Sequence, residues 1–135
     1  MVSRRADWRE RLAALIVERR FLPTIWGQRD CCLFAADAVQ AMTDVDFAES
    51  LRGYRSAKGA VRALRRAGFS CVFDYVDARL PRADRARDGD VVGLPCPKGS
   101  GLDMLFVADG GSVWGQDELG LIRIAPPPGS VVWSV

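Results

Sequence analysis

The strongest constraint on the fold comes from residues 26–37, where a tight loop runs directly into a helix. Gly27 supplies backbone freedom in the loop, Asp30 is a favourable N-cap residue, and Cys31 then takes the first helical position. Apolar residues follow at the spacing of one buried helical stripe, at Phe34, Ala38 and Met42. We therefore predict a helix that begins at Cys31, ends near residue 43 and buries one face in the core.

A cysteine at the start of a helix has two interpretations. The positive end of the helix dipole favours the thiolate, which is the nucleophilic form of the side chain. Free cysteines are more often simply buried, and spacing alone favours Cys31 and Cys32 as small core residues beside a capped helix. The spacing by itself leaves both roles open for Cys31.

Two short motifs resemble those of a known family. They are Trp26-Gly27-x-x-Asp30-Cys31, which opens a Phe-Ala-Ala-Asp helix, and later Asp88-Gly89-Asp90-Val91-Val92. Over residues 21–135 the chain resembles the NlpC-type cysteine peptidases, small papain-like enzymes that cut peptidoglycan stem peptides. Within that superfamily it is similar to an uncharacterised branch encoded beside phage tail genes. The resemblance implies that Cys31 holds the nucleophile position, at the start of a helix packed on an antiparallel sheet.

The catalytic histidine that the resemblance implies is missing, because the chain contains no histidine. Its position falls on Leu102, or on Asp103 if the preceding loop shifts by one residue. Leucine carries no proton. An aspartate, with a reference pKa of about 3.9, is a poor acid for a leaving amine and repels a thiolate unless burial raises its pKa by several units. Because loss of a triad member removes most of the acceleration, we expect a peptidase fold without competent peptidase chemistry, with Asp103 as the candidate nonstandard base.

We expect four further residues to line what remains of a substrate groove beside Cys31, namely Trp26, Asp30, Cys32 and Leu102. Two of them have simpler roles, because Asp30 caps the helix and Trp26 packs the loop. We also expect Cys31 not to be strongly activated at neutral pH, since burial raises the pKa of a thiol while a helix N-terminus lowers it.

The four cysteines do not form a metal-binding pattern. Cys31-Cys32, Cys71 and Cys96 lack the paired spacing of zinc ribbons, and no histidine completes a mixed site. We predict reduced thiols, with no metal and no other cofactor. A thiol-dependent regulator or metal carrier is accordingly the weakest functional interpretation.

The rest of the chain predicts helices first and strands afterwards. Residues 1–20 contain an amphipathic helix that Asp7 can cap, and a second clear helix runs from a cap at Ser56 to Gly68. Residues 46–54 suit a short helical turn, residues 69–73 a strand or extended link, residues 82–88 a polar lead-in and residues 98–101 a turn. Strands are predicted at residues 90–94, 102–107, 112–114, 119–124 and 131–133, with a hairpin at residues 109–111. This pattern predicts one α+β domain, residues 1–135, with N-terminal helices packed on a C-terminal antiparallel meander of about five strands. The resemblance adds a papain-like core.

Charge and hydropathy argue against two classes of protein, those that bind nucleic acids and those that span a membrane. A net charge of +2 is too small to predict nucleic-acid binding, and no apolar run approaches the roughly 20 residues of a membrane span. The first residues do not read as a signal peptide, so we expect synthesis in the host cytoplasm.

Two functions from different classes follow. The first is a structural or adaptor component of a phage or phage-like tail tip, located in the virion, with other tail proteins as partners and peptidoglycan as a further candidate. Its contacts are expected at loops 98–101 and 126–129 and at arginine-rich helix faces, although solvation alone also explains those arginines. The arginines are Arg4, Arg5, Arg9, Arg62, Arg65 and Arg66. The alternative is an active cysteine hydrolase of peptidoglycan stem peptides that uses Cys31 with a nonstandard base.

Overall fold

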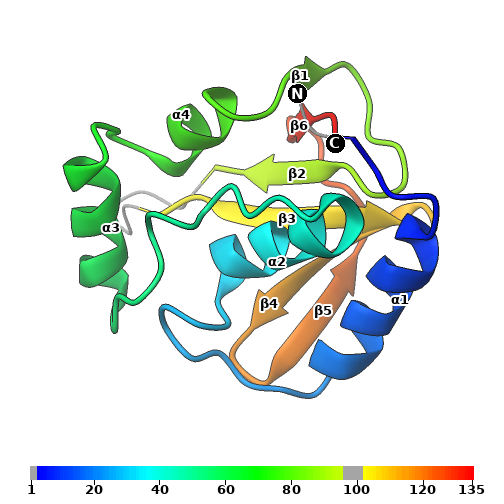
Figure 1. Ribbon diagram of the computed structural model, residues 1–135, viewed down its shortest axis with the longest axis horizontal. Coiled ribbons are helices and arrows are strands. Elements are labelled where there is room, and N and C mark those ends of the chain that lie inside the picture. The colour runs from blue at the N-terminus through cyan, green and yellow to red at the C-terminus, as the bar shows by residue number, and fades with distance from the viewer. Residues whose placement is uncertain (1–2, 96–101) are drawn as a thin grey trace.

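The structure, a computed structural model, describes residues 3–95 and 102–135. Within these residues the chain forms four helices followed by six strands, so the predicted α+β order is confirmed (Figure 1). The helices are α1 Trp8–Arg19, α2 Cys31–Thr43, α3 Ala57–Arg66 and α4 Val72–Asp77. The strands are β1 Arg82–Ala83, β2 Val91–Leu94, β3 Met104–Asp109, β4 Ser112–Asp117, β5 Gly120–Ile124 and β6 Val131–Trp133. None of the described helices is long and apolar enough to cross a membrane. The turn predicted at residues 98–101 lies outside the described residues.

The strands form one antiparallel sheet in the order β1-β6-β2-β3-β4-β5. Strands β2 to β5 follow one another as a meander, as predicted. The turn between β3 and β4 consists of Gly110 and Gly111, which both have positive φ, as a type I′ hairpin requires. In the middle of the sheet Val107 pairs with Val91 on one side and with Trp114 on the other.

Two features differ from the predicted five-strand meander. The segment expected to be a polar lead-in contributes β1, which pairs with β6 through Arg82 and Trp133. Strand β6 does not continue the meander beyond β5 but crosses the sheet and pairs with β2 through Val91 and Trp133. Both differences arise from pairing between segments far apart in the chain, which the local hydrophobic pattern of neither segment specifies.

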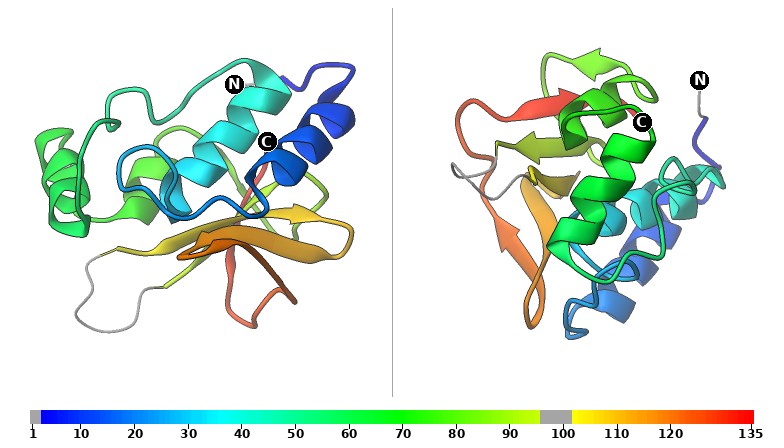
Figure 2. Two further views of the ribbon diagram at one scale, coloured as in Figure 1. Left: turned by 90° about the horizontal axis from the view of Figure 1, so that it is seen from below. Right: turned by 90° about the vertical axis from the view of Figure 1, so that its left-hand side faces the viewer.

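Helix α2 is the central element of the core. Figure 2 shows α1 and α2 covering one face of the sheet, and α2 packs on β3 and β4, so the predicted packing of the cysteine helix on the sheet is confirmed. Because side chains alternate along a strand, each central strand contributes to both faces. The helix-covered face carries Val91, Leu105, Val107 and Trp133 into the main core. The opposite face holds a second apolar cluster of Val92, Phe106, Ala108, Val113 and Val132.

The helix ends follow local sequence in two of three predicted cases. The Asp30 carboxylate accepts a hydrogen bond from the Leu33 N–H at 3.0 Å, and the Ser56 hydroxyl accepts one from the Gly59 N–H at 3.0 Å. Both predicted caps are therefore confirmed. Asp7 precedes α1 without making a capping bond, because its carboxylate accepts hydrogen bonds from the guanidinium groups of two neighbouring arginines.

The prediction of a strand or extended link over residues 69–73 holds as a link for residues 69–71 and is wrong for Val72 and Phe73, because α4 begins at Val72. The buried residues of this helix are Val72, Tyr75 and Val76, which have the i, i+3, i+4 spacing of a helical face. That spacing appears only when residues beyond 73 are included. Residues 47–53 form consecutive turns, in keeping with the short helical turn expected there.

Candidate functional site

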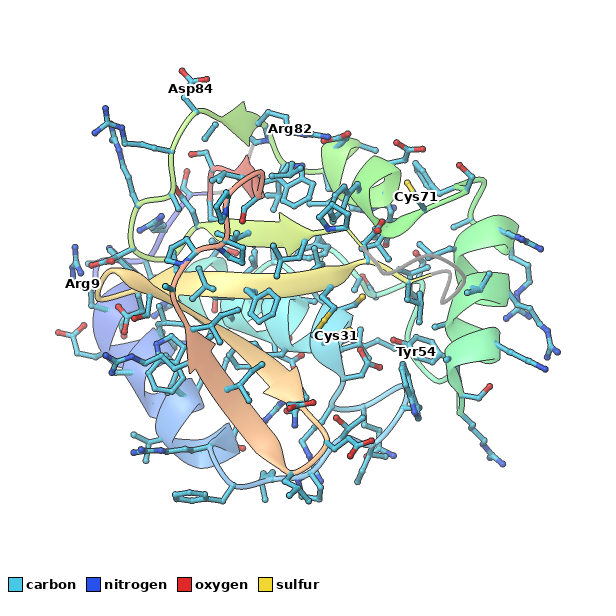
Figure 3. All side chains as sticks on the ribbon, turned by 180° about the vertical axis from the view of Figure 1, so that it is seen from behind. Arg9, Cys31, Tyr54, Cys71, Arg82 and Asp84 are labelled. Atoms are coloured by element: carbon cyan, nitrogen blue, oxygen red, sulfur yellow. The ribbon has the colours of Figure 1, made fainter. Side chains whose placement is uncertain are left out.

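A pocket of about 380 Å³ opens at the start of α2. Cys31, Trp26, Asp30 and Leu102 line it, so the structure brings together four of the six predicted site residues. The remaining lining residues come from the loop before α2, the start of α3, two strands and the turn between β4 and β5, and are Thr24, Ala57, Met104, Gln116, Asp117 and Glu118. Figure 3 shows Cys31 at the N-terminal end of α2 beside the sheet, with Tyr54 on a neighbouring segment.

The carboxylate of Asp30 joins the loop, the helix and a distant tyrosine. It is 1% exposed and accepts three hydrogen bonds, from the N–H groups of Leu33 and Gly27 at 3.0 Å each and from the Tyr54 hydroxyl at 2.6 Å. Burial, together with the negative charge of Asp30, raises the pKa of Tyr54 well above its usual range, so this hydroxyl stays protonated and donates. The first role of Asp30 is therefore to hold the site together.

Gly27 allows the loop to pass directly against Tyr54. Its φ is +82°, and a Cβ at this position would lie 1.8 Å from the carbonyl oxygen of Tyr54. The Gly27 carbonyl also accepts a hydrogen bond from the Gly53 N–H at 3.4 Å. Only glycine satisfies both the left-handed backbone and the close approach, which gives the Trp-Gly-x-x-Asp-Cys motif a steric basis.

Two thiols stand side by side in the first turn of α2. The Sγ atoms of Cys31 and Cys32 are 3.9 Å apart, and Cys32 Sγ lies 3.6 Å from the carbonyl oxygen of Asp103. The hydrogen bond with Cys32 lowers the pKa of the Cys31 thiol below its ordinary value, against the opposing effects of burial and of the Asp30 charge. The same bond, together with burial, raises the pKa of Cys32. The expectation for Cys31 weighed the helix N-terminus against burial, whereas the largest cause in the folded chain is the neighbouring thiol of Cys32.

Leu102, the first of the two positions at which the resemblance implies a catalytic histidine, lines the pocket with Cys31. Asp103 meets the cysteine pair through its backbone, because its carbonyl oxygen faces Cys32 Sγ. The charge of Asp103 is also one of the smaller causes that raise the pKa of Cys32. Asp103 therefore contacts the cysteine pair at Cys32.

Sequence analysis missed two residues of the site, Tyr54 and Gln116. Gln116 in β4 lines the pocket, is 2% exposed, and donates from its amide nitrogen to the carbonyl oxygens of Leu22 and Asp117 at 2.9 Å each. Two carbonyl acceptors fix the orientation of the amide, and its Oε1 is buried without a hydrogen-bond partner among the described residues. A polar residue among predicted strands was the one signal in the sequence that could have pointed to Gln116. The sequence around Tyr54 contains no signal that connects it with Asp30.

Within residues 3–95 and 102–135, no group of three or more acidic or cysteine side chains is arranged to hold a metal ion. Cys31, Cys32 and Cys71 are free thiols. Cys96, the fourth cysteine of the predicted set, lies outside the described residues.

Comparison with known families identifies one that spans almost the whole chain, because its profile matches residues 3–135. The chain belongs to the DUF6950 family. This family is described as a domain of unknown function, and neither the curated proteins nor the solved structures contain a match to the chain. All the described residues of the DUF6950 domain that line the Cys31 pocket fall within the matched range.

The DUF6950 site therefore combines a thiol shifted toward its thiolate form, an open pocket and a buried amide oxygen with no partner in the described structure. A thiolate can attack or bind a soft electrophile. Peptide cleavage also requires a group that passes a proton to the leaving amine, and its pKa should lie near the working pH. Leu102 does not supply such a group.

Proposed function

We propose that this chain is a structural or adaptor component of a phage or phage-like tail, at the tail tip, built on a degenerate papain-like, NlpC-type peptidase fold. One observation carries the proposal, which is that Leu102, the first of the two positions for the catalytic histidine that the resemblance implies, lines the Cys31 pocket and carries no proton. A site that keeps its nucleophile position without an acid–base partner retains the scaffold and loses most of the rate acceleration. We therefore assign the domain a role in binding other proteins and not in catalysis.

The surroundings of Cys31 support the papain-like part of the proposal. Cys31 opens α2, and α2 packs on β3 and β4 of an antiparallel sheet, which is the arrangement that the resemblance implies. The tail assignment rests on the resemblance to a branch encoded beside phage tail genes. Its partners are then other tail proteins, with peptidoglycan as a further candidate, and its location is the virion tail after synthesis in the host cytoplasm.

The test compares particles from a strain that lacks the gene with particles that carry Cys31→Ala. We expect defective tails in electron micrographs of the first and normal infectivity of the second. Cys71→Ala is the matched control, because Cys71 is a free thiol at the start of α4 and not part of the lining of the Cys31 pocket. Intact, infectious tails without the protein would contradict the structural role, and non-infectious Cys31→Ala particles would contradict the dispensable thiol.

A second function, an active cysteine hydrolase of peptidoglycan stem peptides, is favoured by the lowered pKa of Cys31 in an open pocket. Purified peptidoglycan and a synthetic stem peptide are incubated with wild type, Cys31→Ala and Asp103→Asn. Hydrolysis that disappears with Cys31→Ala would replace the structural proposal with the enzymatic one, and its loss with Asp103→Asn would identify the base. Equal turnover by wild type and Cys31→Ala would exclude Cys31 as the nucleophile.

A further inference from the structure

The outer face of α3 carries positive charges that no acidic side chain of the described structure neutralises. We define the α3 basic ridge as Arg55, Lys58, Arg62, Arg65 and Arg66, all of which are exposed. Residues 50–73 contain no aspartate or glutamate, and no ridge residue forms an ion pair with any described residue. Nitrogen-tipped side chains project from this helix into solvent in Figure 3.

Four of the five ridge residues form a single stripe on α3. Arg62, Arg65 and Arg66 lie four, seven and eight positions after Lys58, and at 3.6 residues per turn these four residues share one face, whereas Arg55 precedes the helix. With a rise of about 1.5 Å per residue, the stripe from residue 58 to residue 66 is about 12 Å long. Figure 1 shows α3 at one end of the molecule, and the four side chains of the stripe are exposed, so a large partner can reach them.

This charge arrangement disfavours the free helix. The pairs Lys58/Arg62 and Arg62/Arg66 are like charges at i, i+4, and Lys58 lies in the first turn, at the positive end of the helix dipole. Only Arg65 and Arg66, in the last turn, complement the dipole. The apolar anchor of α3 is small, because its buried residues are limited to Ala60, Ala63 and Leu64. An anionic partner would remove the repulsion and stabilise the helix.

The other arginines that we expected to contact a partner protein already bind groups within the same chain. Arg4 donates to the carbonyl oxygens of Val135 and Asp88 and to the Asp90 carboxylate, at 2.7 to 3.0 Å. Arg5 and Arg9 form ion pairs with aspartates of the same chain. Of the predicted arginine set, Arg62, Arg65 and Arg66 therefore remain without an acidic partner in the described structure.

A hollow of about 450 Å³ adjoins the ridge. Its walls include the apolar side chains of Leu51, Ala63 and Ala67, and the ridge residue Arg66 lies at its edge. The guanidinium of Arg52, which also borders the hollow, is already paired with Asp37 and Asp46. The hollow thus offers an apolar surface next to an uncompensated positive stripe.

We infer that the α3 basic ridge and this hollow form a docking surface for an acidic protein segment that carries an aliphatic side chain among its carboxylates. The guanidinium fork of arginine binds carboxylates bidentately, and the apolar wall receives the aliphatic side chain. A stripe of about 12 Å matches about four extended residues. The inference rests on the proposed function only in assigning this segment to another tail protein.

A protein segment fits this surface better than a nucleic acid does. Phosphates would satisfy the ridge equally well, but single-stranded nucleic acids also stack their bases on aromatic side chains. The ridge contains no aromatic residue, and Tyr54 is the one aromatic residue that lines the hollow, so successive bases have no row of rings on which to stack. The aliphatic part of the wall, formed by Leu51, Ala63 and Ala67, suits a leucine or valine side chain instead.

The test measures binding of a fluorescein-labelled 12-residue peptide, in which pairs of glutamates alternate with leucine, by fluorescence anisotropy at low ionic strength. We expect Arg62→Glu/Arg65→Glu to weaken binding at least about tenfold, because each reversal removes an attraction and adds a repulsion. The neutral variant Arg62→Gln/Arg65→Gln should lose less. The matched control is Arg85→Glu/Arg87→Glu, which makes the same charge change at two exposed arginines outside α3 and should bind like wild type. Circular dichroism verifies that each variant is folded.

Four results would overturn the inference. They are unchanged binding by the ridge variant, an equal loss in the control variant, equal binding of a peptide with glutamine in place of glutamate, and tighter binding of a 12-nucleotide single-stranded DNA than of the acidic peptide. These results are independent of tail assembly. If tails without the protein are intact but the ridge binds the peptide, the proposed function fails and the docking surface stands. If tails require the protein but the ridge variant still binds the peptide, the docking surface fails and the proposed function stands.

Discussion

The hydrogen bonds of Asp30 allow one substitution to be predicted in detail. Asp30 and Ser56 cap α2 and α3 with the same bond, a side-chain oxygen that accepts from the third helical N–H at 3.0 Å. They differ in surroundings, because Ser56 is exposed whereas Asp30 is buried and also accepts from Gly27 and Tyr54. The two caps therefore form a matched pair for replacement by alanine.

Ser56→Ala removes only the cap and should cost about 1 kcal/mol of unfolding free energy. Asp30→Ala removes the cap and also leaves the Gly27 N–H and the Tyr54 hydroxyl without their acceptor. Each donor left unsatisfied in a buried place costs about 1–3 kcal/mol, so the cap and the two donors together cost about 3–7 kcal/mol. Since a small domain loses about 2 kcal/mol per molar urea, the unfolding midpoint should fall by about 1.5–3.5 M for Asp30→Ala and about 0.5 M for Ser56→Ala.

The assay is urea unfolding at pH 7, followed by circular dichroism and tryptophan fluorescence. Tyr54→Phe extends it to a double-mutant cycle, because it deletes the donor and leaves the ring in place. If the 2.6 Å bond is formed, Tyr54→Phe should cost about 1.5–3 kcal/mol in wild type and much less in Asp30→Ala. Equal destabilisation by Asp30→Ala and Ser56→Ala, or strict additivity of Asp30→Ala and Tyr54→Phe, would refute the reasoning.

Three further substitutions have defined outcomes. Asp37→Asn removes one charge from a mostly buried pair of ion contacts to two arginines and should lower the unfolding free energy by about 2–4 kcal/mol, measured by urea unfolding. Asp77 has a pKa lowered by its hydrogen bond with the neighbouring arginine, so its contribution to stability is present above about pH 4 and is lost as pH falls through the folded pKa. The stability difference between wild type and Asp77→Asn should therefore shrink from pH 7 to pH 3, and a constant difference would contradict the pairing. Gly27→Ala should displace the loop from Tyr54, seen as lower stability and faster alkylation of Cys31, and wild-type values for both would show that the close approach is absent.

The elements that sequence predicted well are those fixed by neighbouring residues. The start of α2 needs only the Asp30 cap and the buried stripe that follows, and the β3–β4 hairpin needs only two glycines able to adopt positive φ. The same holds for Ser56 at the start of α3. In each case the free energy that selects the conformation comes from contacts within a few residues, so the local pattern contains it.

The elements that sequence missed depend on contacts across the fold. The two-residue strand β1 exists because it pairs with β6, and β6 lies beside β2 because the chain crosses the sheet after β5. The site shows the same division. The pattern located Cys31 and Asp30, but the Tyr54 hydroxyl and the buried Gln116 amide reach the site from other segments, and only the folded chain brings them there.

The arginines show most clearly why the folded structure changes the interpretation of a residue's function. In the sequence Arg4 and Arg62 are equivalent, since both lie in arginine-rich stretches next to predicted helices. In the structure Arg4 bridges the N-terminal segment to Asp90, a carboxylate that is 3% exposed, and substituting it would leave that buried charge without its cation. Arg62 is exposed on a helix and forms no ion pair with any residue that the structure describes, so its substitution should barely change stability and should act on binding alone. A loss of stability on substitution thus distinguishes an arginine that holds the fold together from one that is free to bind a partner. Because substitution in the α3 basic ridge should not change stability, a binding defect there can be assigned to a lost contact with the partner.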